Sequence, residues 1–266
     1  MKVAAYQAPL AACADAQVIT LIRQQVDRCE ELGVELLCCP EAVMGGLADY
    51  VDQPERNAID TSKGGLDRVL APLASDRVTI VLGFTEQGSD GHLYNAAAVY
   101  GRGTVLGVYR KHHPAINQSV YRAGTEAPVF TVGHVTFGVL ICRDSLFPEP
   151  ARTMLSRGAQ LFLVPTNNGM PAAKGGSEIV VEARACDIER ATASGVPIVR
   201  ADVAGVDGGF ASYGSSGIVN RNGELIGTAR TLVADLVVAN IDLRQYQQEN
   251  GLKDVVQDQS WIQHAI

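Results

Sequence analysis

The chain contains 266 residues, of which 47% are hydrophobic and 19% are charged, a composition typical of a globular protein rather than a disordered one. A chain of this length can form one large α/β domain, or two small ones, around a sizeable core. The formal net charge is −7, and the lysines and arginines are scattered along the sequence, which argues against a nucleic-acid partner.

No segment predicts a membrane partner or a disulfide-rich protein. No apolar run approaches the roughly 20 residues that span a bilayer, and residues 1–7 lack the long apolar segment of a signal peptide. Six cysteines are few for this length, and none has the Cys-x-x-Cys or Cys/His spacing of a zinc site. We therefore expect a protein of the reducing cytoplasm. Five thiols are predicted to lie in apolar or helical core settings: Cys13, Cys29, Cys38, Cys39 and Cys186.

Strand and helix signals alternate along the first part of the chain. Residues 2–8 are predicted to form a strand. The next segment is predicted to be a helix that Asp15 caps and Gly33 ends, because its apolar residues recur at helical spacing. A buried strand follows at residues 34–39, and residues 42–65 show no periodicity and are predicted to be mainly loop.

The same alternation continues to the end of the chain. Further helices are predicted over residues 66–73, 149–156 and 177–194. Further strands are predicted over residues 78–84, 94–100, 105–109, 129–132, 135–141, 161–165, 196–203, 215–219, 224–228 and 232–241. Because no linker and no repeat of fixed period divides the sequence, we predict a single domain over residues 1–266, with residues 242–266 as a C-terminal arm.

Glycines mark the predicted turns. Gly101-Arg102-Gly103 joins two strands as a hairpin, and Asn222-Gly223 is a strong hairpin signal. Gly205, Gly208 and Gly209 are predicted to form a loop on the substrate side, since no helix pattern follows them as it does in a phosphate-binding loop.

Three polar residues share one placement, since Glu41, Lys111 and Cys142 each follow a predicted strand. In open α/β sheets, ligands bind outside the carboxyl ends of the strands. A cysteine thiolate can attack an acyl carbon, a carboxylate can take the thiol proton, and a lysine can stabilise negative charge on the substrate oxygen. Each residue alone also has a structural explanation: Glu41 as a cap, Lys111 as a solvated strand end and Cys142 as a small buried residue.

Six short motifs, in this order and spacing, resemble the nitrilase superfamily of carbon–nitrogen hydrolases over essentially the whole chain. The three main motifs are Pro40-Glu41-Ala42, Tyr109-Arg110-Lys111-His112-His113, and Ile141-Cys142-Arg143-Asp144 with Phe147-Pro148-Glu149. The other three are Val164-Pro165-Thr166-Asn167-Asn168, Glu182-Ala183-Arg184-Ala185 and Tyr213-Gly214-Ser215-Ser216-Gly217.

The resemblance implies an α/β fold in the form of a four-layer α-β-β-α sandwich, which usually dimerises through the helices that cover its sheets. It also implies a Glu–Lys–Cys triad that hydrolyses non-peptide C–N bonds without a metal or an organic cofactor. Glu41 is then the general base, Lys111 the oxyanion stabiliser and Cys142 the nucleophile. The backbone N–H of Arg143 completes the oxyanion hole.

One position departs from the pattern of the family. Many members carry a second glutamate in the loop after the lysine, and alignment on Tyr121-Arg122-Ala123-Gly124 places Asn117 there. An asparagine can hydrogen-bond substrate or Lys111, but it cannot carry a proton. The predicted substrate-binding residues are Asn117, Arg143 and Asn167, although an exposed or structural role is an equal alternative for Arg143.

These patterns together predict a cytoplasmic amidohydrolase that cleaves a small linear amide or carbamoyl compound through a cysteine thioester, as a homodimer or a higher homo-oligomer. Two alternatives stay open: a nitrilase that converts a nitrile, and a non-catalytic binding or regulatory protein that retains the fold. A comparison of ammonia release from nitriles with ammonia release from amides distinguishes a nitrilase from an amidase. Acylation of the protein without turnover would support the non-catalytic alternative.

Overall fold

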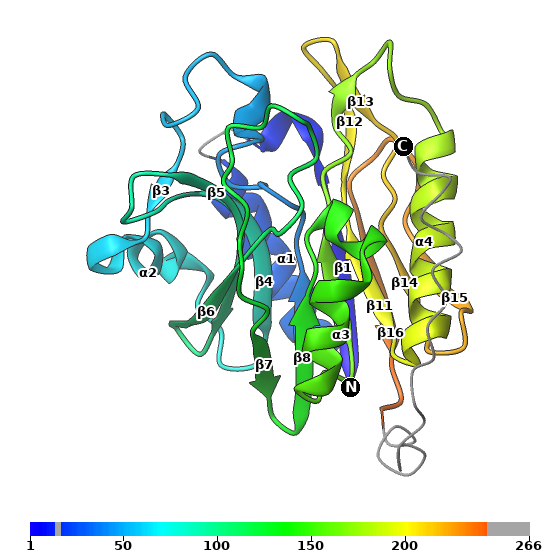
Figure 1. Cartoon of the computed structure of the whole chain (residues 1–266). Coiled ribbons are helices and arrows are strands. Elements are labelled where there is room, and N and C mark those ends of the chain that lie inside the picture. The colour runs from blue at the N-terminus through cyan, green and yellow to red at the C-terminus, as the bar shows by residue number, and fades with distance from the viewer. Residues whose placement is uncertain (14–16, 244–266) are drawn as a thin grey trace.

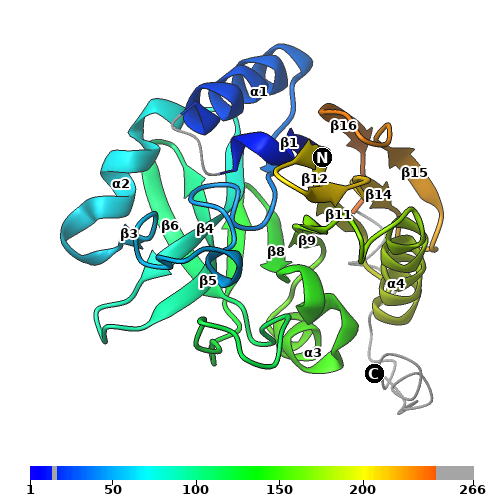
Figure 2. The same cartoon turned by 90° about the horizontal axis from the view of Figure 1, so that it is seen from above.

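Two β-sheets face each other between two pairs of helices in the computed structural model, which describes residues 1–13 and 17–243 (Figure 1). Helices α1 (Val18–Leu32) and α2 (Gly65–Leu70) cover the outer face of one sheet. Helices α3 (Pro148–Ser156) and α4 (Glu178–Ser194) cover the outer face of the other, as the view from above shows (Figure 2). The predicted four-layer α-β-β-α sandwich is confirmed.

The first sheet is built around the N-terminal strand. Its strands are β1 (Lys2–Pro9), β2 (Leu36–Cys38), β3 (Ile59–Asp60), β4 (Thr79–Gln87), β5 (Leu93–Gly101), β6 (Thr104–Arg110), β10 (Met170–Pro171), β12 (Val203–Asp207), β13 (Phe210–Ser212) and β16 (Asp235–Asn240). Strands β1, β2 and β4 run parallel, and β4, β5 and β6 continue as an antiparallel meander. On its other side, β1 pairs with β16 along residues 2–7 and with β12 at residues 8–9.

The second sheet has three parallel strands at its centre. Its strands are β7 (Val129–Val132), β8 (Val135–Val139), β9 (Phe162–Pro165), β11 (Ile198–Ala201), β14 (Gly217–Val219) and β15 (Leu225–Thr228). Strands β8, β9 and β11 are parallel, and antiparallel hairpins add β7 on one side and β14 with β15 on the other.

The alternation of side chains along β2 shows how the layers are held together. Leu36 and Cys38 enter the core between the two sheets, whereas Leu37 and Cys39 pack against the helices on the outer face. The adjacent cysteines therefore point to opposite faces, and both are buried. The predicted burial of Cys13 and Cys29 is also confirmed, but Cys186 on α4 is only half-buried.

The prediction of one strand over residues 196–203 is wrong, because this segment forms two strands in different sheets. β11 lies in the second sheet and β12 in the first, and Asp202 lies between them. The buried Asp202 carboxylate accepts hydrogen bonds from the backbone N–H groups of Asn168, Val203 and Ser215. These bonds fix the point at which the chain crosses from one sheet to the other.

The predicted glycine-rich loop after this strand is also different in the structure. Gly208 and Gly209 have φ angles of 52° and 89° and form the turn of a β-hairpin between β12 and β13. Positive φ angles are accessible to glycine at little cost, so this pair permits a tight reversal. The predicted cap Asp15 and nearly all of the predicted arm, residues 242–266, lie outside the described residues. Within residues 1–13 and 17–243, no helix is both long and apolar enough to cross a membrane.

Candidate active site

Glu41, Lys111 and Cys142 lie at the carboxyl ends of strands from both sheets. Glu41 follows β2, Lys111 follows β6 and Cys142 follows β8. Lys111 Nζ donates to Glu41 Oε1 at 2.5 Å, and the side chains of this ion pair are only 3% and 2% exposed. The charges of both residues act on the thiol of Cys142. The structure thus brings together the three residues that the sequence singled out.

The Glu41 carboxylate is fixed from both sides. Oε1 accepts hydrogen bonds from Lys111 Nζ and from Asn95 Nδ2, the latter at 2.7 Å. Oε2 accepts one from the backbone N–H of Asn167 at 3.0 Å. Since Oε2 has one donor and Oε1 has two, Oε2 keeps more lone-pair capacity to receive a proton.

Two glycines allow the backbone to approach closely around this ion pair. A Cβ atom on Gly83 of β4 would lie 2.4 Å from the backbone nitrogen of Ala42 and 2.5 Å from Cα of Glu41. A Cβ atom on Gly124 would lie 2.3 Å from the carbonyl oxygen of Arg110, next to Lys111. Side chains at these positions would displace Glu41 and Lys111, so the site depends on both glycines.

The chain turns sharply at Cys142, whose φ angle is 46°. A non-glycine residue in this region costs of order 1–3 kcal/mol and persists only where its surroundings fix it. Here Ser145 Oγ donates to the Cys142 carbonyl oxygen at 2.8 Å, and the backbone N–H of Asp144 donates to the carbonyl oxygen of Ile141. The turn opens the 3-10 helix Cys142–Leu146, which leads into α3.

Asp144 connects this turn to the segment that carries Lys111. Its fully buried carboxylate accepts hydrogen bonds from the Tyr109 hydroxyl at 2.7 Å and from the backbone N–H of His113 at 2.9 Å. His113 Nδ1 lies 3.0 Å from the same carboxylate, and the imidazole stacks on the Phe147 ring at 3.8 Å between centroids. His113 therefore supports the turn through Asp144.

Burial and neighbouring charge set the protonation of the thiol and the ammonium. Burial raises the pKa of the Cys142 thiol to about 12, with a further increase from Glu41 and an opposing decrease from Lys111 and Arg200. Burial also disfavours the Lys111 ammonium, but the negative charges of Glu41 and Asp144, with the hydrogen bond to Glu41, hold its pKa above the ordinary value. At neutral pH the thiol is thus protonated and the lysine is charged, so the thiol requires a proton acceptor to become a nucleophile.

The structure treats the three predicted substrate-binding residues differently. Asn167 contacts Glu41, since its backbone N–H bonds the carboxylate and its side-chain Nδ2 donates to the Glu41 carbonyl oxygen at 3.3 Å. Arg143 is half-buried, with its guanidinium carbon 5.8 Å from the Phe147 ring centroid. Asn117 is exposed on the loop after Lys111, and no hydrogen bond or ion pair in the described part of the chain joins it to the triad.

Asn95 was not predicted, although it contacts Glu41 directly. It is the polar residue in the apolar run of β5, and all residues of this strand are buried. Its side-chain Oδ1 is a buried acceptor without a hydrogen-bond partner among the described residues. An amide inside an otherwise apolar strand is the signal that could have identified it, because a buried polar group needs a partner.

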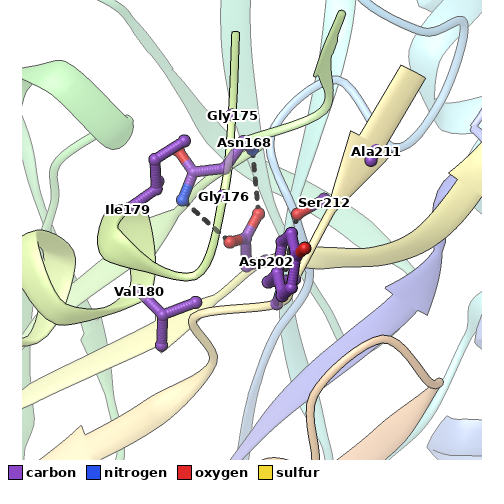
Figure 3. Close-up of a pocket in the computed structure, with 10 residues that line it drawn as sticks. Asn168, Gly175, Gly176, Ile179, Val180, Asp202, Ala211 and Ser212 are labelled. Atoms are coloured by element: carbon purple, nitrogen blue, oxygen red, sulfur yellow. Dashed lines mark hydrogen bonds between the residues drawn. The ribbon is translucent and has the colours of Figure 1, made fainter. Parts of the chain in front are cut away.

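A small pocket lies beside the site, where Asn168 faces Asp202 (Figure 3). Its free volume is about 10 Å³, room for about one water molecule and too small for a substrate. Tyr50 is 43% exposed and makes an edge contact with Phe210 at 5.6 Å between centroids. Burial, Asp49, Glu41 and Cys142 raise the pKa of Tyr50 and Lys111 lowers it, so this phenol lies within electrostatic reach of all three candidate residues.

Comparisons relate the chain to proteins of one family. The sequence profile of the carbon-nitrogen hydrolase family matches residues 2–249. A nitrilase of Pyrococcus abyssi is 34% identical over 185 residues, which cover 68% of this chain and 66% of that protein. An N-carbamoylputrescine amidase of Solanum tuberosum is 31% identical over 180 residues, which cover 62% of this chain and 60% of that protein.

The fold has a similar solved structure of nearly the same extent. An amidase of Nesterenkonia AN1, from the nitrilase superfamily, superposes with a TM-score of 0.74 at 25% identity and 94% coverage of both chains. The chain spans about two thirds or less of the length of the two curated relatives.

Proposed function

The chain belongs to the carbon–nitrogen hydrolase family of the nitrilase superfamily, and we propose that it hydrolyses a non-peptide C–N bond of a small linear amide or carbamoyl compound. The observation that carries the proposal is the placement of Cys142 at a strained turn where the charges of Glu41 and Lys111 act on its thiol. Strained residues of this kind cluster at active sites.

In the first half of the proposed reaction, Cys142 attacks the carbonyl carbon of the substrate. Glu41 Oε2 takes the thiol proton as the S–C bond forms, because the thiol is not ionised beforehand at neutral pH. Negative charge moves to the substrate oxygen, where the Lys111 ammonium and the backbone N–H of Arg143 stabilise it. Glu41 then returns the proton to the nitrogen, the C–N bond breaks, and ammonia or an amine leaves.

In the second half, water releases the acid from the thioester. Glu41 takes a proton from the water molecule as its oxygen attacks the acyl carbon. The C–S bond breaks, and the proton returns to the sulfur of Cys142. The Asn95 and Asn167 donors hold the carboxylate in one orientation through both halves of the reaction.

A panel of simple amides, N-carbamoyl amines and nitriles tests this function. We expect ammonia release from at least one amide or carbamoyl compound, and mass spectrometry should detect an acyl group on Cys142. Cys142→Ala should fold normally and lose both signals, and Cys142→Ser should be nearly inactive because Glu41 is too weak a base to ionise a hydroxyl. Turnover restricted to nitriles would show a nitrilase, and a stable acyl adduct without turnover would show a binding protein.

We also propose that the chain forms a homodimer in the cytoplasm. Val181 and Ile188 on α4 are 67% and 39% exposed, and Leu225 and Ile226 on β15 are each 39% exposed. The hairpin that leads to β15 lies against α4, since a Cβ atom on Gly223 would be 3.3 Å from Ile188. Exposed apolar side chains this close together favour an interface.

A further inference from the structure

A buried ion pair lies behind the Cys142 turn and has no part in the reaction proposed above. Arg200 of β11 donates from Nε to Asp187 Oδ2 at 2.7 Å and from Nη2 to Asp187 Oδ1 at 2.6 Å. Both residues are 3% exposed, and Asp187 belongs to α4. Desolvation of two buried charges often cancels their attraction, so such a pair is weak evidence for a stabilising role. Its remaining contacts indicate a different role.

Those contacts lead to both halves of the candidate site. Arg200 Nη2 donates to Ser145 Oγ at 3.1 Å, and Ser145 Oγ in turn donates to the carbonyl oxygen of Cys142 at 2.8 Å. Arg200 Nη1 donates to Thr166 Oγ1 at 2.6 Å, and the carbonyl oxygen of Thr166 accepts the backbone N–H of Glu41 at 3.2 Å. The rigid guanidinium of Arg200 therefore connects the turn at Cys142 with the backbone of Glu41.

The same guanidinium brings a positive charge to the thiol. Arg200 lowers the pKa of Cys142 against the larger effect of burial, and the Asp187 carboxylate in contact with it offsets part of that charge. Other titratable groups that interact with Cys142 include Glu41, Lys111, Asp202 and Tyr50.

We propose that the Arg200–Asp187 pair is a positioning unit, which fixes the Cys142 turn relative to Glu41 and keeps a second positive charge next to that turn. The role in turnover rests on the proposed function. The effect on the reactivity of the Cys142 sulfur does not, because simple alkylation of the thiol reports it without any substrate. Neither residue touches the reacting atoms, so both act through Ser145, Thr166 and the charge of the guanidinium.

The test compares Arg200→Gln with Asp187→Asn. For each variant, the rate of Cys142 carbamidomethylation by iodoacetamide is followed across pH by mass spectrometry of the Cys142 peptide. Arg200→Gln should move the profile to higher pH, because a cation near the thiolate is lost. Asp187→Asn should move it to lower pH, because the guanidinium charge is no longer offset. Since both substitutions break the same ion pair, purely structural damage would move both profiles in one direction, and that result overturns the proposal.

Two further variants separate geometry from charge. Ser145→Ala removes the bridge to the Cys142 carbonyl but leaves the ion pair, so kcat should fall about tenfold with little change in the alkylation profile. Arg200→Lys keeps the charge but cannot reach both hydroxyls, so it should retain a profile near that of the native protein and still lose kcat. Unchanged kcat in both variants overturns the geometric part of the proposal.

Matched controls use the ion pair of Arg23 and Asp27 on α1, because it is far less buried than the pair of Arg200 and Asp187. Arg23→Gln and Asp27→Asn should change neither the profile nor kcat. Circular dichroism checks the fold, and if Arg200→Gln does not fold, an Asp187→Asn profile that fails to move to lower pH still refutes the proposal. Opposite shifts without turnover on any substrate would refute only the proposed function, and normal turnover without shifts would refute only the positioning unit.

Discussion

At the scale of single residues, the negative charge of the proposed base makes the proposed nucleophile harder to ionise. Glu41 raises the pKa of the Cys142 thiol that it is proposed to deprotonate. A thiol with a pKa of about 12 carries little negative charge at neutral pH, so its resting reactivity toward simple reagents should be low. In the proposed reaction Glu41 takes the thiol proton while Cys142 attacks the substrate, so the reaction does not depend on a thiolate formed beforehand.

Glu41→Gln should therefore affect alkylation and turnover in opposite directions. Loss of the carboxylate removes an anion that raises the thiol pKa, so carbamidomethylation of Cys142 at pH 8 should become faster. Turnover should be lost, because no base remains to accept the proton. The measurement is the iodoacetamide rate at Cys142 beside ammonia release from the best substrate. Slower alkylation in this variant would contradict the electrostatic account of the site.

Asn95→Ala tests whether the unpredicted amide orients the base. A hydrogen bond to a charged group contributes about 1.5–3 kcal/mol, so kcat should fall by roughly 10- to 100-fold. KM should change little, because we assign Asn95 no contact with the substrate. Steady-state kinetics on the best substrate measures both constants. Asn220→Ala is the control, since Asn220 bonds Glu224 at an exposed turn, and equal effects of the two changes would remove Asn95 from the site.

At the scale of elements, the ends of strands were easier to predict from the sequence than the long-range hydrogen bonds that hold the strand ends in place. Glu41 and Cys142 stand where apolar runs stop, so periodicity and motif order located them. The predicted strand over residues 196–203 is divided at Asp202, whose carboxylate accepts hydrogen bonds from the backbone N–H groups of residues 168 and 215. No local sequence pattern connects these residues to residue 202, so the division was not predicted. The partners of Arg200 lie at sequence separations of 13 to 55 residues. Local periodicity carries no information about contacts of that kind.

Gly83→Ala tests the close approach of β4 to the loop of Glu41. The added Cβ would lie within 2.6 Å of three backbone atoms of residues 40–42, so the backbone must shift. We expect a loss of about 1–3 kcal/mol in the free energy of unfolding together with a lower kcat. Thermal denaturation and steady-state kinetics measure the two effects. Gly91→Ala is the control, because Gly91 lies in an open turn where only its positive φ angle is unfavourable and kcat should not change.

At the scale of the whole molecule, the proposed dimer interface predicts a change of mass in solution. Val181→Glu with Ile188→Glu should convert the dimer to a monomer, because burial of two carboxylates against apolar surface is unfavourable. Light scattering after size-exclusion chromatography measures the mass. Val206→Glu is the control, since Val206 is 70% exposed on β12 of the other sheet and should remain compatible with a dimer. A monomer in the native protein would contradict the proposal.

The pairing of β1 with β16 has a consequence for how the protein is made. The amino group of Met1 donates to the carbonyl oxygen of Ile241, a separation of 240 residues, and β1 is central in its sheet. During synthesis, the edge of β1 that pairs with β16 therefore stays unpaired until almost all of the described chain has emerged from the ribosome. Long-range pairing of this kind slows folding and leaves an edge that other chains can bind. Chaperone dependence and aggregation of the nascent chain should thus be concentrated in the interval before residues 235–240 emerge from the ribosome.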